Sequence, residues 1–363
     1  MNNSLERNKS APLTIRTSPH LKKVLTVPQI MRNVVYALLP ICAWSVWQFG
    51  LSALALIIIT TLSCMATEQL FTAISDKKST LSDYSVVITG ILLALTLPPG
   101  FPLWMAAVAG FVAVALGKML FGGLGQNPFN PALVGRAFVQ AAFPVSITTW
   151  TPGFLPERFS SFIPSSLALP FMSPADSSAW IAGQVDAYSS ATPLSLFKFE
   201  QVTTSTSDLM LGMVSGSAGE TSALLVLLCG GFLIARGIMG WKIPAAVILG
   251  ALLTATPFWL MNADIYPSPL FVIFSGGLML AAMFMATDMV GTPLTPTGIW
   301  IYGLFIGFMT VIIRLFGGLP EGAMYAVLVA NALAPLIDSV TQPRAFGTCA
   351  RGAGLKPQSR EEA

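Results

Sequence analysis

The sequence predicts an all-α polytopic membrane protein with about ten transmembrane helices. Of the 363 residues, 54% are hydrophobic and only 10% are charged, whereas soluble domains carry about 25% charged residues. Apolar runs recur along the whole chain, and many reach the roughly 17–25 residues that cross a bilayer. These runs do not alternate apolar and polar residues, so they do not fit the strands of a β-barrel.

Turn and breaker residues divide the apolar runs into ten predicted helices. The breakers include the stretches "LPPGFP", "GGLGQNPFNP" and "DMVGTPLTPTG". The predicted helices cover 33–49, 52–74, 83–98, 101–121, 130–143, 220–236, 243–260, 268–287, 298–315 and 320–337. The run at 130–143 is short for a complete membrane crossing.

Five regions follow from this division. They are a polar, basic N-terminal arm (1–32), a first membrane half (33–143), a segment rich in Ser, Thr and Pro (144–219), a second membrane half (220–337) and a C-terminal tail (338–363). The arm lacks the apolar core and the cleavage site of a signal peptide. We therefore expect the first helix to be retained.

The distribution of basic residues predicts the orientation. Lys and Arg are enriched in cytoplasmic loops. With ten spans and a cytoplasmic N-terminus, only Arg158, Lys198 and Arg314 fall on the outer side, and Arg136 lies near the start of the fifth helix. The asymmetry predicts that both termini are cytoplasmic and that residues 144–219 lie on the outer, periplasmic face.

Similar turn motifs suggest that the two membrane halves are related. "GQNPFNPALVG" (125–135) follows the fourth predicted helix, and "GTPLTPTG" (291–298) follows the eighth. Halves of five helices each enter the membrane from opposite sides. The sequence thus predicts two five-helix inverted repeats, an architecture found in transporters.

Cysteine and histidine usage argues against a metal centre. His20 is the sole histidine, and no two of the cysteines have CxxC spacing. The cysteines are Cys42, Cys64, Cys229 and Cys349. The first three lie in apolar runs, where cysteine behaves as a small hydrophobic residue. We expect no metal or iron–sulfur ligation by this chain alone.

The stretch "VDAYSSATPLSLF" (185–197) is crowded with hydroxyls. The surrounding 144–219 segment contains no Cys and no His, so Tyr188 is the one side chain in this stretch that could bond a flavin ring directly. A Ser or Thr hydroxyl can instead join a cofactor through its phosphate. Pro193 favours an extended backbone at Thr192, which could hold the hydroxyl outward.

Four stretches resemble the Rnf D / Nqr B family of membrane subunits. "VDAYSSATPLSLF" is similar to the family's flavinylation motif, and "GQNPFNPALVGRAF" (125–138) resembles a signature of the same subunits. "SPHLKKVLTVPQIMRNVVYALLP" (18–40) and "MATDMVGTPLTPTG" (285–298) resemble the family's N-terminal region and its late Thr-Asp loop. The resemblance implies a urea-channel-like fold, and the short N-terminal arm favours the Rnf D type.

The resemblance also implies a set of site residues. In the family the motif threonine carries FMN through a phosphoester bond, which corresponds to Thr192 here. Ser189, Ser190 and Ala191 complete the motif, with Ser190 standing where the family usually has glycine. Asp186 either orients the loop, assists attachment or is a simple turn residue. Arg136 either holds a flavin phosphate, binds a backbone carbonyl or extends to the membrane interface.

By the same resemblance, the chain is expected to relay electrons between reduced ferredoxin and NAD⁺ in a complex that moves Na⁺ or H⁺ across the bacterial inner membrane. Expected partners are the A, B, C, E and G subunits of that complex, a flavin transferase and membrane lipid, with no nucleic acid. The chain shows no G-x-G-x-x-G fingerprint for NAD and has no complete active site of its own. A non-covalent flavin such as riboflavin is a second expected cofactor.

Ionisable residues near the spans are candidates for an ion path because they are costly in lipid. They are Glu68, Asp83, Asp288 and Asp338, and a capping role at the interface is the alternative for each. Two other functions are compatible with the pattern: a channel or secondary transporter without redox chemistry, and a membrane anchor for a partner enzyme.

Overall fold

The computed structural model describes residues 25–76, 80–172, 174–175, 177, 180–181, 191–220 and 222–343. Every regular element in these ranges is a helix, and they contain no strand. The prediction of an all-α polytopic membrane protein is therefore confirmed. Most of the predicted N-terminal arm and of the C-terminal tail lies outside the described residues.

The first half contains the five helices that the hydropathy pattern predicts. They are α1 (Val27–Phe49), α2 (Leu51–Ile74), α3 (Ser85–Leu95), α4 (Leu103–Gly117) and α5 (Pro131–Ala142), with short turns η1 (Leu81–Asp83) and η2 (Met119–Phe121). The first helix begins before its predicted start at residue 33, because Thr26 and Gln29 form a reciprocal cap around Pro28. This capping box, rather than hydropathy, marks the start of α1.

The second half contains α10 (Ala223–Ala235), α11 (Lys242–Met261), α14 (Pro296–Phe316) and α15 (Ala323–Thr341). The helix predicted at 268–287 is not continuous. It divides into α12 (Pro269–Phe274), α13 (Leu278–Leu280) and the π-helical turn η5 (Ala281–Met285). The break falls at Ser275–Gly277, where Gly276 has a φ of 59°, a conformation that glycine adopts without strain.

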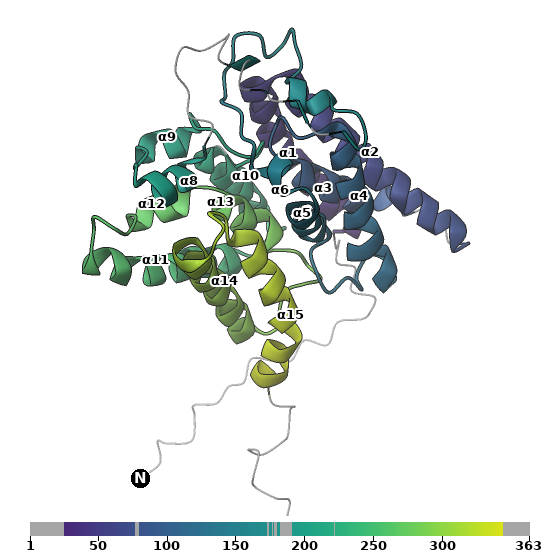
Figure 1. The fold of residues 1–363 in the computed structure, drawn as a ribbon. Coiled ribbons are helices and arrows are strands. Elements are labelled where there is room, and N and C mark those ends of the chain that lie inside the picture. Colours follow the sequence, from purple (N-terminus) through teal and green to yellow (C-terminus); the bar gives the residue numbers. More distant parts are fainter. Residues whose placement is uncertain are drawn as a thin grey trace, which may run out of the picture.

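The two halves pack in the same order. In the first half α2 contacts α3 and α4, and α4 contacts α5; in the second, α11 contacts α12 and α14, and α14 contacts α15. Figure 1 shows the purple and blue first half beside the green and yellow second half. Pairs α1–α10 and α5–α15 join them. Since each half has five segments, the second runs opposite to the first across a membrane.

The turn motifs that suggested the repeat nevertheless begin helices that are not equivalent. The 125–135 motif leads into α5 and the 291–298 motif into α14, but by packing order α14 corresponds to α4. The motifs look alike because they share capping chemistry. Asn130 accepts a hydrogen bond from the Ala132 amide, Thr295 accepts one from the Gly298 amide, and each cap is followed by proline.

Six helical stretches in the described residues are long and apolar enough to span a membrane. They are Val27–Phe49, Leu51–Ile74, Leu103–Phe121, Lys242–Met261, Pro296–Phe316 and Ala323–Thr341. The other four segments are α3, α5, α10 and the broken α12–η5, and they are shorter. One apolar core extends through both halves and includes Leu93 and Leu133 from the first and Leu280 and Ala326 from the second.

The described part of the 144–219 segment folds back onto the helix ends. It contains α6 (Pro144–Thr148), η3 (Pro164–Leu167), α8 (Pro193–Ser195), the π-helical turn η4 (Leu196–Glu200) and α9 (Thr206–Leu211). The amide of Leu51 donates to the Arg158 carbonyl at 2.9 Å, and Arg158 Nε donates to the Trp47 carbonyl at 2.9 Å. These bonds cover the bend between α1 and α2.

Candidate functional site

Thr192 is the N-cap of α8, and its hydroxyl is turned into the protein. The backbone is extended, with ψ of 157°, as the following proline predicts. Thr192 Oγ1 accepts a hydrogen bond from the Ser195 amide at 3.3 Å and lies 3.0 Å from Ser195 Oγ. The residue is only 4% exposed. The expectation that the hydroxyl is held outward is therefore wrong, because capping draws it toward the first turn of the helix.

The Thr192 segment, residues 191–201, is fixed at both ends. Ser215 Oγ donates to the carbonyl of Ala191 at 2.7 Å. Lys198 Nζ donates to the carbonyls of Arg314 at 2.9 Å and Leu319 at 3.1 Å, and also to that of Gly317. The ammonium group thus binds carbonyls at the C-terminal end of α14, where a positive charge is favourable.

The remaining residues of the predicted flavinylation motif lie outside the described part of the chain. These are Asp186, Ser189 and Ser190, together with Tyr188. Their predicted roles stay predictions. Of the motif, the structure describes Ala191 and Thr192, and Arg136 is the other described member of the predicted site.

Arg136 lies in α5 and is buried, with 3% of its side chain exposed. Nη2 forms an ion pair with Glu321 Oε2 at 2.9 Å, and Nη1 donates to the carbonyl of Thr96 just after α3. Of the three predicted roles, the structure shows the contact with a backbone carbonyl. The guanidinium does not extend to the membrane interface. A contact with a flavin phosphate stays a prediction.

Arg136 belongs to a largely buried charge cluster that the sequence reasoning missed. The charge cluster consists of Arg136, Glu220, Arg314 and Glu321. Arg314, in α14, donates to the carbonyls of Val272 at 2.6 Å and Ser275 at 3.0 Å. Both carbonyls lie at the broken end of α12, so Arg314 satisfies backbone groups that the helix break leaves free.

Glu220 is held in the cluster by the loop that precedes α10. The amides of Ala218 and Gly219 donate to the carbonyls of Leu97 at 3.0 Å and Leu95 at 2.8 Å. Glu220 Oε2 is buried and has no hydrogen-bond partner among the described residues. Burial, and then the negative charge of Glu321, raise the pKa of the Glu220 carboxyl to about 8, although Arg136, the Ser217 hydroxyl and Arg314 act in the opposite direction.

Two small cavities connect this cluster with Thr192. Arg136, Glu220, Arg314 and Glu321 line a cavity of about 20 Å³. Glu220 and Glu321 also line a second cavity of about 10 Å³, together with Thr192. The two carboxylates therefore line both the cavity beside Thr192 and the cavity beside the two arginines.

Two sequence features could have indicated the cluster. Arg314 lies inside a strongly apolar predicted helix, where a charged residue is expensive and usually paired. Glu220 and Glu321 each stand beside glycine at the start of a predicted helix, in "SAGETS" and "LPEGA". In the structure both carboxylates line the cavity that Arg136 and Arg314 also line.

A large cavity of about 310 Å³ lies between the two halves, away from Thr192. Its wall is mostly aliphatic, with contributions from Val34, Leu92, Leu233 and Ile243. Its polar groups include Thr89, Asn127 and Asp288. Ser85 and Lys118 also line this cavity, and they connect it to a buried polar network.

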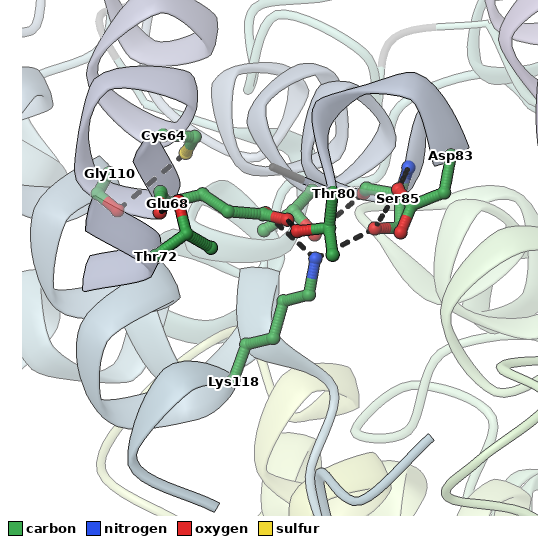
Figure 2. Close-up of polar contacts among 9 residues, drawn as sticks. Cys64, Glu68, Thr72, Thr80, Asp83, Ser85, Gly110 and Lys118 are labelled. Carbon is green, nitrogen blue, oxygen red and sulfur yellow. Dashed lines mark hydrogen bonds and ion pairs between the residues drawn. The ribbon is translucent and has the colours of Figure 1, made fainter. Parts of the chain in front are cut away.

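The polar network is shown in Figure 2. Lys118 Nζ pairs with Glu68 Oε2 at 2.8 Å and donates to Ser85 Oγ at 2.7 Å. Ser85 Oγ donates in turn to Asp83 Oδ1 at 2.6 Å, and Thr80 Oγ1 donates to Glu68 Oε1. Lys118 and Glu68 are 3% and 0% exposed. The buried ion pair therefore reaches the wall of the large cavity through Lys118.

The four residues considered for an ion path occupy different environments. Glu68 is buried in the pair with Lys118. Each aspartate accepts a hydrogen bond from a backbone amide. Asp83 accepts from Ser85, Asp288 from Val290, and Asp338 from both Leu294 and Thr295. The capping alternative thus describes the contacts of the three aspartates, while Glu68 makes no such contact.

The cysteines of the described residues lie apart. Cys42, Cys64 and Cys229 are free thiols on α1, α2 and α10. No group of three His, Cys, Asp or Glu side chains in the described ranges could hold a metal ion. Cys349 and His20 lie outside those ranges.

Comparison with known proteins identifies the family. A family model described as the NQR2, RnfD, RnfE family matches residues 14–347. The D subunit of the Na⁺-translocating ferredoxin:NAD⁺ oxidoreductase complex of Acetobacterium woodii is 39% identical, over 92% of this chain and 95% of its own. The D subunit of the proton-translocating ferredoxin:NAD⁺ oxidoreductase complex of Clostridium ljungdahlii is 37% identical, over 92% of this chain and 96% of its own.

A third relative carries a broader name. The D subunit of the ion-translocating oxidoreductase complex of Alcanivorax borkumensis is 37% identical, over 92% of this chain and 97% of its own. These matches extend over both halves and the segment between them, as the four resembling stretches predict. The chain belongs to the NQR2, RnfD, RnfE family.

Proposed function

We propose that this chain is the membrane flavoprotein subunit of a redox-driven, ion-translocating complex that transfers electrons between reduced ferredoxin and NAD⁺. The support comes from the relatives, which are named as the D subunits of such complexes and match more than nine-tenths of the chain. One of these relatives is named as Na⁺-translocating and the other as proton-translocating, and their sequence identities to this chain are nearly equal. The proposal therefore includes either ion.

Thr192 is the proposed site of covalent FMN, joined through a phosphoester. The surroundings of Thr192 fit such a bond because an esterified Oγ1 keeps lone pairs that accept hydrogen bonds. The Ser195 amide can continue to donate to it, and Ser195 Oγ can donate where it now faces a hydroxyl. FMN would supply one- and two-electron chemistry, while the chain supplies its position and electrostatic environment.

The cavity beside Thr192, of about 10 Å³, is too small for a flavin ring. A ring attached here therefore lies outside that cavity, and the charge cluster faces the attachment point rather than the ring. Ser215 and Lys198 fix the segment through backbone carbonyls and not through Thr192 Oγ1. This arrangement supports a tether with a rigid base.

The large cavity is the proposed site of the second, non-covalent flavin. Its volume of about 310 Å³ is within the roughly 300–1,000 Å³ of small-molecule sites. Aliphatic walls with a few polar groups at the edge suit a planar heteroaromatic ring such as that of riboflavin. Asn127 and Thr89 are available to orient it.

The orientation follows from the basic residues, and we assign both termini to the cytoplasm of a bacterial inner membrane. Thr192 and the 144–219 segment are then periplasmic. Expected partners are the A, B, C, E and G subunits of the complex, the flavin transferase that esterifies Thr192, and lipid. The names of the relatives as one lettered component of a complex support membership of a multi-subunit assembly.

Flavin fluorescence after denaturation tests this function. The chain is co-expressed with a flavin transferase, denatured and run on a gel. Fluorescence is expected in the protein band of the wild type and of Thr192→Ser, and is expected to be absent from Thr192→Val, which keeps the shape but lacks the oxygen. Thr203→Ala, an exposed position in the same segment, is the matched control and should remain fluorescent.

Two results would overturn the proposal. Fluorescence that persists in Thr192→Val would show that the flavin is attached to another residue. A dark wild-type band, from cells in which the transferase labels another substrate, would favour the alternative of a channel or transporter without redox chemistry. Omitting the transferase is the negative control.

A further inference from the structure

The charge cluster contains one group that can change its charge near neutral pH. Arg136 and Arg314 stay protonated in proteins. Glu321 is paired with Arg136 at 2.9 Å. Glu220 Oε2 is buried and has no hydrogen-bond partner among the described residues; burial and the charge of Glu321 favour its protonated form more strongly than Arg136, Ser217 and Arg314 favour the carboxylate.

The charges that face Glu220 come from three other elements. Arg136 belongs to α5, Arg314 to α14 and Glu321 to the loop between α14 and α15. Lys198 of η4 approaches α14 but binds its terminal carbonyls. With Glu220 protonated, the two arginines and Glu321 leave the cluster with a net charge of +1; with Glu220 ionised, the cluster is neutral.

We propose that Glu220 is a proton-binding site whose occupancy is linked to the charge at Thr192, so that negative charge at Thr192 is accompanied by a proton on Glu220. The geometry behind this is the cavity that Glu220 and Glu321 share with Thr192. In the native protein the negative charge would come from the phosphodiester of FMN at Thr192, so this part of the inference rests on the proposed function. The linkage itself is a property of the chain.

The physical basis is Coulombic interaction in a poorly solvated site. A negative charge at Thr192 disfavours a second negative charge on Glu220 and favours the cluster with net +1. By linkage, the proton on Glu220 favours the added negative charge to the same extent. In each uptake event one proton leaves the aqueous phase and forms an O–H bond on the Glu220 carboxyl, and ionisation returns it to water.

The structural observation that supports a proton rather than a metal ion is the size of the cavities. At about 10 and 20 Å³ they hold at most about one water molecule, and two arginines line the larger one. Burial that raises the pKa of Glu220 to about 8 is consistent with a proton held at neutral pH.

The linkage can be tested without any flavin. Thr192→Asp adds a negative charge at the cap position, and Thr192→Asn is its neutral match; both side chains are good helix caps. The carbonyl stretch of a protonated carboxylic acid is followed by infrared spectroscopy from pH 5 to 11, in protein made without transferase. The same spectra in a Glu220→Gln background identify the band of Glu220.

In Thr192→Asn we expect this band to disappear with a midpoint near the pKa of about 8. In Thr192→Asp the midpoint should lie at least about one pH unit higher. Equal midpoints in the two variants would overturn the linkage. A spectrum with no band that Glu220→Gln removes would overturn proton binding itself.

A second measurement uses the flavinylated protein. The midpoint potential of the covalent flavin is titrated with dithionite and mediators between pH 6 and 10, in wild type, Glu220→Gln and the control Glu200→Gln, whose side chain is exposed on η4. The flavin ring takes up protons on reduction in all three proteins, so each potential falls with pH. Because reduction also adds negative charge, wild type and Glu200→Gln should share an additional decrease near pH 8 that Glu220→Gln lacks. Coinciding curves for all three would overturn the inference while leaving the proposed function intact.

The two proposals fail in different ways. Absence of covalent flavin contradicts the proposed function but does not affect the comparison of Thr192→Asp with Thr192→Asn. Equal infrared midpoints contradict the linkage even when the gel band is fluorescent. Since glutamine resembles a protonated glutamate in shape and charge, Glu220→Gln is expected to fold.

Discussion

Arg136 and Glu321 form an ion pair at 2.9 Å that joins the two membrane halves. One partner is in α5 and the other precedes α15, and these helices contact each other. The pair also fixes the end of α3, because Arg136 donates to the Thr96 carbonyl. It therefore connects the packing of the repeats to the surroundings of Thr192.

Removing Arg136 is expected to destabilise the protein. Arg136→Met leaves Glu321 without its buried partner, and breaking a buried pair costs about 3–5 kcal/mol; because 19% of the Glu321 side chain is exposed, we expect the lower end of this range. The control is Arg236→Met, an exposed arginine bonded to Asn33. Thermal unfolding in detergent measures both, and equal melting temperatures would contradict the role of the pair.

Lys198 is expected to determine how firmly the Thr192 segment is held. Lys198→Met removes the ammonium group from three carbonyls at the end of α14. Hydrogen bonds to a charged group contribute about 1.5–3 kcal/mol. Limited proteolysis should cut between residues 196 and 215 faster in this variant than in Lys242→Met. Unchanged cleavage would show that the packing of Phe197 on Phe271 is sufficient.

The Lys118–Glu68 pair should show strong coupling in a double-mutant cycle. Lys118→Met alone leaves a carboxylate that is 0% exposed without its cation, which costs about 3–5 kcal/mol. Adding Glu68→Met removes the unpaired charge, so the double variant should be more stable than either single variant. Unfolding midpoints of the four proteins give the coupling. Additive effects would mean that the two side chains do not depend on each other.

Stability should decrease with rising pH because of Glu220. Its carboxyl has an ordinary pKa of 4.5, raised in the fold to about 8. Between these values the folded protein binds one more proton than the unfolded chain, so the free energy of unfolding falls by up to about 1.4 kcal/mol per pH unit. The contribution is complete below pH 4.5 and lost above pH 8. Glu220→Gln should remove this slope, which melting curves from pH 5 to 9 would show.

Gly50 should not tolerate a side chain. Its φ is 73°, and a Cβ added there would collide with the carbonyl of Arg158. That carbonyl accepts the Leu51 amide, so it cannot move without losing the bond. Gly50→Ala is expected to lower the melting temperature. Gly231→Ala, where a Cβ meets nothing within 4 Å in α10, should be neutral or slightly stabilising.

The sequence by itself determined the helical class, the positions of nine of the ten predicted membrane helices and the family, but not the short helices α6, α8 and α9. Apolar runs long enough to cross a bilayer leave no other regular structure that satisfies the backbone in lipid. Capping residues such as Thr26 and Asn130 then set where helices begin. These signals are local, since a cap depends on residues within one turn and an apolar run on the residues of a single helix.

Only the tertiary structure decided what surrounds Thr192. It turned the hydroxyl inward as a cap, broke the helix at Ser275–Gly277, and brought Arg136, Glu220 and Glu321 to the same cavity. Those residues are far apart in sequence and come from both halves. Hydropathy is calculated for each segment separately. It indicates that a charged residue in an apolar helix needs a partner, but it does not identify that partner. The partner is chosen when the two halves pack together.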